Sequence, residues 1–291
     1  MPIPDNPSLI EQLAGYYEDA AARLSQIVIS PPGRTAAAQE FNHARAAQQL
    51  AQVNREIFLL RHHASQWTSE AITDAVRRGT LLADKQAASA GIQAPGLSGS
   101  FGAINTQAVE VLARDTIGDL YKAADSMGNT AAFALRKMAA TGVTNAQVNQ
   151  IIAGRAIIEG QPQAAVRELR DLLEKVHGKR VVIQGKSGPI SFDTGYYAKM
   201  IATTKTREAV VTANSHRLQQ HGIDLVRIVG KVSVHFCTAF LGHVYSISGG
   251  HSRYPALSSL PSGGPPFHPN CSKSTVPFIE GLSTPDAADA A

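Results

Sequence analysis

Residues 231–281 read KVSVHFCTAFLGHVYSISGGHSRYPALSSLPSGGPPFHPNCSKSTVPFIEG and contain both cysteines of the chain. Each cysteine has a histidine close by, in the patterns His235-x-Cys237 and His268-x-x-Cys271. Two such pairs, separated by a loop rich in Gly, Pro and Ser, are typical of a tetrahedral zinc site, because each pair supplies two corners from one local backbone shape. The spacing therefore predicts a structural zinc ion held by these four residues.

Three other interpretations of the cysteines stay open at this stage. Buried cysteines without a ligand are common in folded cores. A Cys237–Cys271 disulfide fits across the loop, but the N-terminus has no basic region followed by an apolar core, so we expect synthesis in a reducing cytoplasm, where disulfides rarely persist. A nucleophilic cysteine needs a histidine base and a group that orients the base, and no local signature of a known thiol enzyme surrounds either residue.

The composition of the 291 residues describes a globular protein. Hydrophobic residues make up 44% and charged residues 17%, which is incompatible with wholesale disorder, and the length favours two domains. The net charge of +4 is not concentrated into a run of Lys and Arg, so steering of phosphate is conceivable but sequence readout is not indicated. No stretch approaches the ~18 apolar residues that would span a bilayer, and we expect no membrane association.

The first 178 residues predict a mainly α-helical region, because apolar residues recur at steps of three and four. Capping boxes are predicted for Ser8 with Glu11 and for Thr144 with Gln147. Trp67, Ile72 and Val76 share one face of a helix and are predicted to be core. Some helices are rich in Ala and Gln and suit packing against other helices or subunits, so region 1–178 is predicted to dock on partners. The expected helices cover residues 8–27, 35–63, 67–79, 105–126, 130–140, 144–159 and 162–177.

Residues 179–282 predict a small α+β domain with short antiparallel strands, followed by a flexible tail at 283–291. A hairpin is expected from 180–183 and 190–193, then a helix from 193 to about 221 that ends at Gly222. Arg207 and Glu208 are interpreted as solvated charges on the polar face of that helix. Further strands are expected at 223–229, 232–236, 243–248 and 274–279.

Four stretches of this domain occur in a distinctive order: FCTAFLGHVYSISG at 236–249, YPAL at 254–257, FHPNC at 267–271 and PFIEG at 277–281. The order resembles the C-terminal module of tailed-phage minor capsid proteins, in the minor capsid protein 2 and Mu F-like head morphogenesis families. The resemblance covers residues 181–281 and extends to the helix at 67–79. The sequence departs from the family pattern at Ser272 and Lys273, where the family usually has Arg-Cys or Arg-His, and it lacks a second cysteine near Cys237.

This resemblance implies a minor structural protein of a tailed-phage head, made in the bacterial cytoplasm and assembled inside the capsid near the portal. The portal protein, the major capsid protein and packaged double-stranded DNA are the partners it implies, with a role in head morphogenesis or in DNA packaging or ejection. It implies no enzymatic activity. The alternatives are a DNA-binding packaging accessory and an enzyme delivered with the genome, either a metal-dependent hydrolase or a toxin-like transferase. Against an enzyme, Glu280 is the only carboxylate between residues 235 and 281.

Overall fold

The computed structural model describes residues 5–29, 43–92, 103–153, 163–185 and 187–283. Their contacts divide the chain into two compact units. The helical unit comprises residues 10–67 and 117–199, and the mixed unit comprises residues 1–9, 68–116 and 200–291. The sequence predicted a helical docking region at residues 1–178 and an α+β region at residues 179–282. This assignment of roles in assembly to the two regions stays a prediction. The predicted flexible tail, apart from Ser283, lies outside the described residues.

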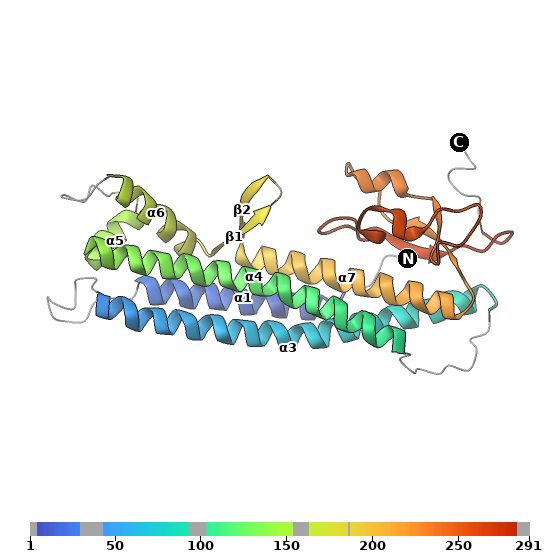
Figure 1. Cartoon of the computed structure of the whole chain (residues 1–291), viewed down its shortest axis with the longest axis horizontal. Helices are drawn as coiled ribbons and strands as arrows, with labels where there is room; N and C mark the ends of the chain where they lie inside the picture. The colour runs from blue at the N-terminus through green and yellow to red at the C-terminus, as the bar shows by residue number, and fades with distance from the viewer. Residues whose placement is uncertain (1–4, 30–42, 93–102, 154–162, 186, 284–291) are drawn as a thin grey trace. The chain divides into compact units, whose positions relative to one another are not determined.

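Six α-helices account for most of the described chain (Figure 1). The sequence predicted separate helices at 35–63 and 67–79, but the described part of both ranges belongs to one helix, α3, and residues 35–42 lie outside the description. The patterns at 105–126 and 130–140 also form one helix, α4. The helices are α1 (Pro7–Ile29), α3 (His43–Ser89), α4 (Ala103–Thr141), α5 (Asn145–Ile152), α6 (Gln163–His177) and α7 (Thr194–Gln220).

Two glycines that lie inside these helices allow close packing and do not end them. A Cβ atom at Gly79 of α3 would lie 2.4 Å from the carbonyl oxygen of Val210 on α7. A Cβ atom at Gly128 of α4 would lie 2.7 Å from Cγ1 of Ile57 on α3. Each glycine therefore marks a place where two helices approach more closely than alanine would allow. Helix α3 runs through Gly79 and continues for ten more residues, to Ser89.

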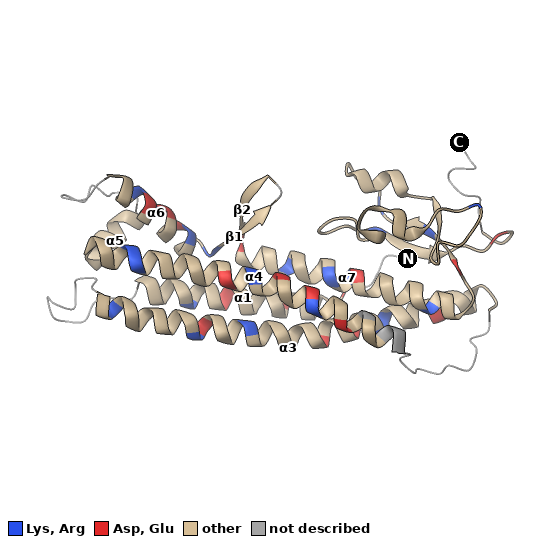
Figure 2. Cartoon of the chain, in the orientation of Figure 1, with Lys and Arg blue, Asp and Glu red and all other residues tan. Residues whose placement is uncertain are grey.

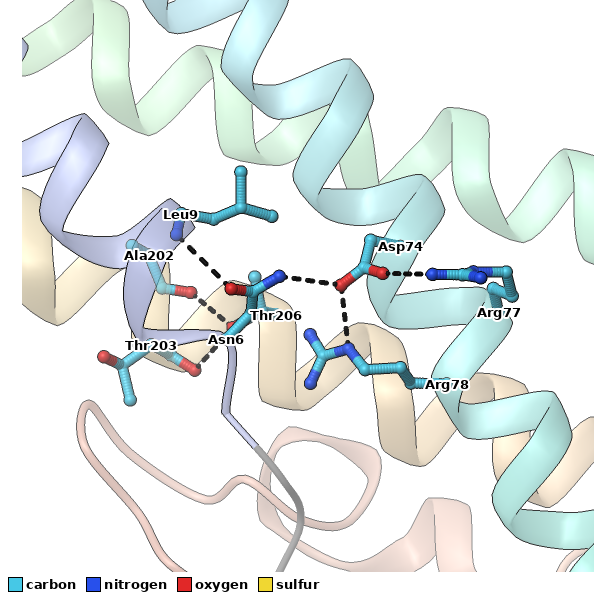
Figure 3. Close-up of polar contacts among 8 residues, drawn as sticks. All are labelled: Asn6, Leu9, Asp74, Arg77, Arg78, Ala202, Thr203 and Thr206. Carbon is cyan, nitrogen blue, oxygen red and sulfur yellow. Dashed lines mark hydrogen bonds and ion pairs between the residues drawn. The ribbon is translucent and has the colours of Figure 1, made fainter.

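Helix α1 begins one residue before the predicted start. The side-chain oxygen of Asn6 accepts a hydrogen bond from the backbone N–H of Leu9 at 3.5 Å, and Pro7 takes the first helical position, where no N–H is needed. Asn6 also donates to Asp74 of α3, which is paired with Arg77 and Arg78 (Figure 3). The capping role predicted for Ser8 with Glu11 was wrong, because Asn6 fills it.

The core of the helical unit is apolar. Leu13, Tyr17, Leu120, Leu135 and Met138 are fully buried on α1 and α4. The Tyr17 hydroxyl donates a hydrogen bond of 2.7 Å to the carbonyl oxygen of Leu120, so this buried polar group has a partner. The prediction that Trp67, Ile72 and Val76 are core residues is confirmed, since each is at most 2% exposed, although Trp67 is in the helical unit and the other two are in the mixed unit.

The predicted hairpin is also part of the helical unit. Strand β1 (Arg180–Gly185) pairs antiparallel with β2 (Gly188–Asp193). The hydroxyl of Ser126 on α4 donates to the carbonyl oxygen of Val182 at 2.6 Å and accepts from its N–H at 3.1 Å. One side chain of α4 therefore satisfies both backbone groups of a residue in the hairpin. The capping box predicted for Thr144 and Gln147 is confirmed at the start of α5.

The mixed unit contains a three-stranded antiparallel sheet in the order β4-β3-β5. Its strands are β3 (Leu225–Val229), β4 (Val244–Ser246) and β5 (Ser274–Pro277). Gly222 has φ of 76° and follows the last turn of α7, as predicted. Both cysteines lie in a hydrophobic core built from the sheet and the loops, and this core also includes Ala83 and Ala87 of α3. The strands of the C-terminal region are therefore packed on residues from the first third of the chain.

The strand predicted at 232–236 is wrong. The backbone N–H and carbonyl of Ser233 are both bonded to the hydroxyl of Thr238, at 3.0 and 2.6 Å. These bonds bend the chain at the start of the 3₁₀-helix η1 (Phe236–Phe240). The backbone N–H and carbonyl of Ser233 are therefore not available to pair with a strand. Val232 and Val234, which gave the alternating pattern, are 81% and 102% exposed. The two remaining short helices are η2 (Leu257–Ser259) and η3 (Pro261–Gly263).

The fold class predicted from the sequence is confirmed: a mainly α-helical N-terminal region precedes a small α+β region with short antiparallel strands. Among the described residues, no helix combines the length and the apolar character that crossing a membrane requires.

Candidate metal centre

Three of the four predicted metal ligands lie together in the mixed unit. The ligand atoms of Cys237, His268 and Cys271 are all within 4.8 Å of one another. Cys237 Sγ is 3.2 Å from Nε2 of His268, and both cysteines are free thiols with 1% of their surface exposed. His235 is exposed and is not part of this cluster, although its ring centroid is 4.7 Å from that of His268.

The backbone around the cluster explains why these side chains converge. Cys237 is the second residue of η1. The hydroxyl of Thr238, also in η1, accepts a hydrogen bond from the backbone N–H of Ser233 and so holds this helix against the preceding chain. His268 and Cys271 belong to one tight turn, in which the N–H of Cys271 donates to the carbonyl of His268 at 3.0 Å and Asn270 has φ of 59°. Asparagine tolerates this left-handed conformation better than most residues. The spacing His-x-x-Cys thus brings two ligands to one side of a turn.

Hydrogen bonding leaves the correct imidazole nitrogen of His268 available as a ligand. Nδ1 lies 2.9 Å from the carbonyl oxygen of Pro269. A carbonyl can only accept, so Nδ1 carries a proton, and Nε2, which faces Cys237, is the nitrogen that remains to coordinate a metal. Metal-binding histidines usually have their second nitrogen fixed in this way.

The environment of Cys237 favours its thiolate. Burial raises the pKa of the thiol, but hydrogen bonds with His268, Ser233 and Cys271 and the positive charge of Lys273 lower it more, so the pKa lies below its ordinary value. Lys273 is only 1% exposed, and its Nζ donates to the carbonyl oxygen of Lys231 at 2.5 Å. The thiolate is the form of cysteine that binds metals. Lys273 was not predicted as a site residue.

Helix α7 supports the turn from outside. Arg207 donates from Nη1 to the carbonyl oxygen of Cys271 at 3.1 Å, and Thr204 Oγ1 accepts from the N–H of Asn270 at 3.1 Å. Arg207 is also paired with Asp5 at 2.6 Å. The interpretation of Arg207 as a solvated charge was wrong, because its side chain is 19% exposed and bonded on two sides. No local pattern could indicate these contacts, because Asp5 and Cys271 are both distant from Arg207 in the chain.

A family model described as Phage minor capsid protein 2 matches residues 185–291. The matched part of the chain contains the whole candidate metal cluster and the supporting residues Thr204 and Arg207 of α7. Comparison with curated proteins and with solved structures found no match.

The matched region also contains a hollow of about 500 Å³ beside His268. Polar residues of α7, including Lys205, Glu208 and Ser215, line one side, and the loop 257–269 lines the other. Glu208 is the single carboxylate among the described residues lining the hollow, and it is paired with Lys205 at 3.3 Å while its side chain stays 36% exposed, which fits a charge on the polar face of α7. A hydrolase would need a base in a position to activate water, and an ion-paired glutamate is poorly suited to that task.

Proposed function

We propose that this protein is a minor structural component of a tailed-phage head that is assembled near the portal and contributes to head morphogenesis or to DNA packaging or ejection. The observation that carries the proposal is the family match of residues 185–291, preceded by a long helical region. In this proposal the helices of residues 1–178 dock on the portal protein or the major capsid protein. Synthesis takes place in the host cytoplasm.

The distribution of charge favours docking over DNA binding as the main role. Lys and Arg alternate with Asp and Glu along the helices (Figure 2). Several of these charges are paired across or along helices, as in Arg23 with Glu56 and Lys137 with Glu168. A DNA-binding accessory would concentrate its basic side chains on one face. Contact with packaged DNA is therefore secondary in this proposal.

We further propose that Cys237, His268 and Cys271 hold a structural zinc ion, with His235 as the fourth ligand. The support is the convergence of the three ligand atoms, the position of His268 Nε2 facing Cys237 while Nδ1 is bonded to a carbonyl, and the lowered pKa of Cys237. The rings of His235 and His268 are already neighbours, with centroids 4.7 Å apart, which makes the exposed His235 the candidate for the fourth bond. Zinc would connect the end of the loop 249–270 to η1 through its ligands, without the need for strand pairing between them.

The test of the assembly role uses the intact phage. The gene for this chain is deleted and supplied in trans with a C-terminal epitope, and purified heads and tails are analysed separately by quantitative mass spectrometry. Chemical cross-linking of the heads then identifies neighbouring proteins. We expect the chain in heads, cross-linked to the portal protein. Recovery in tails only, or absence from all particles, would contradict the proposal.

A further inference from the structure

The surface of the helical unit has a groove between α3 and α4 whose two walls carry the same residues at the same spacing. On each helix an asparagine is followed four positions later by phenylalanine and three positions after that by arginine. All six residues line a hollow of about 610 Å³. The two triplets are Asn54, Phe58 and Arg61 on α3 and Asn129, Phe133 and Arg136 on α4.

The two helices run in opposite directions along this groove. Arg61 of α3 is paired with Asp125 of α4, and Ile57, one turn earlier, packs against Gly128, one turn later. In an antiparallel pair, equal spacing on both helices places equivalent residues around a local two-fold axis between them. The groove is therefore nearly symmetric, with a phenylalanine on each wall and an arginine at each end.

Both phenylalanines are exposed in the middle of long helices. Phe58 is 69% exposed and Phe133 is 55% exposed, although aromatic residues of this size contribute most when buried. The guanidinium of Arg136 lies over the ring of Phe133, 5.9 Å from its centroid. Paired apolar residues of this kind beside a hollow mark a binding surface more often than scattered single ones.

One difference breaks the symmetry. Asp125 neutralises Arg61, and the position on α3 that corresponds to Asp125 holds Leu50, which lines the groove at the opposite end. Arg136 accordingly makes no ion pair with any residue in the described part of the chain, and the Phe133 ring is the partner that positions it. The groove thus offers two aromatic side chains and one guanidinium group, that of Arg136, which is not paired with a carboxylate of the described chain.

We propose that this groove binds a helix of another virion protein, which places apolar side chains between the two phenylalanines and a carboxylate against Arg136. The inference rests on the proposed docking role of the helices and names the surface that performs it. Residues 50–61 rise about 16 Å along α3, so the groove matches about three turns of a bound helix. The carboxylate of the bound helix forms an ion pair with Arg136, as Asp125 does with Arg61.

A second copy of this chain fits the groove less well. Two copies related by a two-fold axis would bring together four guanidinium groups, from Arg61 and Arg136 of each copy, with only the two Asp125 carboxylates to neutralise them. Like charges at an interface that lacks counter-charges oppose association. A partner helix with an acidic residue removes this cost, which is why the occupant is assigned to a different protein.

The experiment uses the full chain in the complemented deletion phage, with p-benzoylphenylalanine in place of Phe133 as the photo-cross-linking probe. We expect irradiation of purified heads to join position 133 to a helical segment of another virion protein that carries Asp or Glu. We expect Arg136→Glu to lower the number of copies per head at least about tenfold, as for loss of a central charged anchor. Arg167→Glu, on the exposed face of α6, is the charge-matched control and should assemble normally.

A second pair of variants guards against misfolding. Phe58→Ser combined with Phe133→Ser should also reduce incorporation, whereas Val111→Ser, at an exposed position of α4 outside the groove, should not. All variants should retain the helical circular dichroism of the natural chain. Cross-linking of position 133 to a second copy, or no cross-link together with normal incorporation of Arg136→Glu, would overturn this inference alone. Absence of the unmodified chain from heads would overturn the proposed function as well.

Discussion

The helical unit and the mixed unit bury very different side chains. Of the thirteen buried polar or charged residues in the described chain, eleven belong to the mixed unit and two, Gln49 and Thr194, to the helical unit. The helical unit satisfies most backbone groups within its helices, so its core can be apolar. The mixed unit contains residues 230–273, where regular structure is short, and side chains must bond to the backbone there. Only Ser246 and Lys273 of the eleven lie in that segment, however. Six lie on helices of the mixed unit, where Thr116 and Thr206 bond to carbonyls one turn back and Arg217 is paired with Asp84, so buried polar side chains there have local or ion-pair partners.

The largest expected effect concerns the metal ligands of the mixed unit. Cys271→Ser should abolish zinc binding and increase hydrogen exchange in residues 249–270, while amides of α1 and of the first half of α3 stay protected. Structural zinc contributes ~10–16 kcal/mol of apparent binding free energy, which exceeds the stability of most domains. Elemental analysis and hydrogen-exchange mass spectrometry measure both effects.

Ser272→Ala is the control for that variant, because Ser272 is the exposed neighbour of Cys271 and is not one of the three clustered residues. If the natural protein, purified without added metal, contains less than about a tenth of an equivalent of zinc and both thiols titrate freely, the zinc proposal is wrong.

The second effect compares two helical glycines. Gly79→Ala should destabilise the chain by about 2 kcal/mol, because the new methyl group meets a backbone oxygen that cannot move aside. Gly118→Ala, on α4 with no atom within 4 Å of the new Cβ, should stabilise it by about 0.5–1 kcal/mol through helix propensity. Urea unfolding of both variants gives the comparison, and equal effects would refute the close approach of α3 and α7 at Gly79.

The third effect tests the single buried hydroxyl–carbonyl bond described between α1 and α4. Tyr17→Phe should cost about 1–2 kcal/mol, because the carbonyl of Leu120 loses its donor in an apolar core. Burial raises the pKa of Tyr17 far above its ordinary value, so the hydroxyl remains a donor at every accessible pH. Tyr16→Phe, whose hydroxyl is bonded only to exposed Gln12, should change the unfolding free energy by less than about 0.5 kcal/mol.

The smallest effect is a pH dependence in the mixed unit. Burial raises the pKa of Asp84, but hydrogen bonds from Arg217 and His221 and their charges lower it more, so its folded-state pKa is below the unfolded value. A depressed pKa contributes stability above the unfolded pKa, and this contribution is lost as the pH falls below about 4.

Asp84→Asn should therefore destabilise the chain at pH 7, and the difference from the natural protein should shrink by pH 3. Asp171→Asn, which removes an exposed pair with Lys175, is the control and should show little pH dependence. A constant difference between the natural chain and Asp84→Asn from pH 7 to pH 3 would refute the assignment.

Local sequence patterns were sufficient for the elements that local physics determines. The helices followed from apolar periodicity, and the hairpin followed from the turn at Gly185 and Gly188, which pair across the strand ends. The prediction of a strand at 232–236 was wrong because the hydroxyl of Thr238 bonds both backbone groups of Ser233, which are then not available for pairing with a strand.

For the candidate site, spacing identified the three side chains that the structure brings together, because each pair of ligands is local. Arg207, Thr204 and Lys273 could not be predicted, since their roles arise from partners that are remote in sequence, such as Asp5 for Arg207 and Lys231 for Lys273. A lysine after Cys271 looks like a surface residue until the fold shows that its amine is buried against a carbonyl.

The contacts of Arg207 with Asp5 and with Cys271 have a consequence for the order of folding. Their partners are separated by 202 and 64 positions in the chain. Contacts of such separation cannot form until nearly all of the protein has left the ribosome, and folding slows as the share of distant contacts rises. The segment around Asp5, just before α1, and the turn at residues 268–271 before β5 are therefore expected to reach their final positions late, after the helices that separate them in the chain have formed.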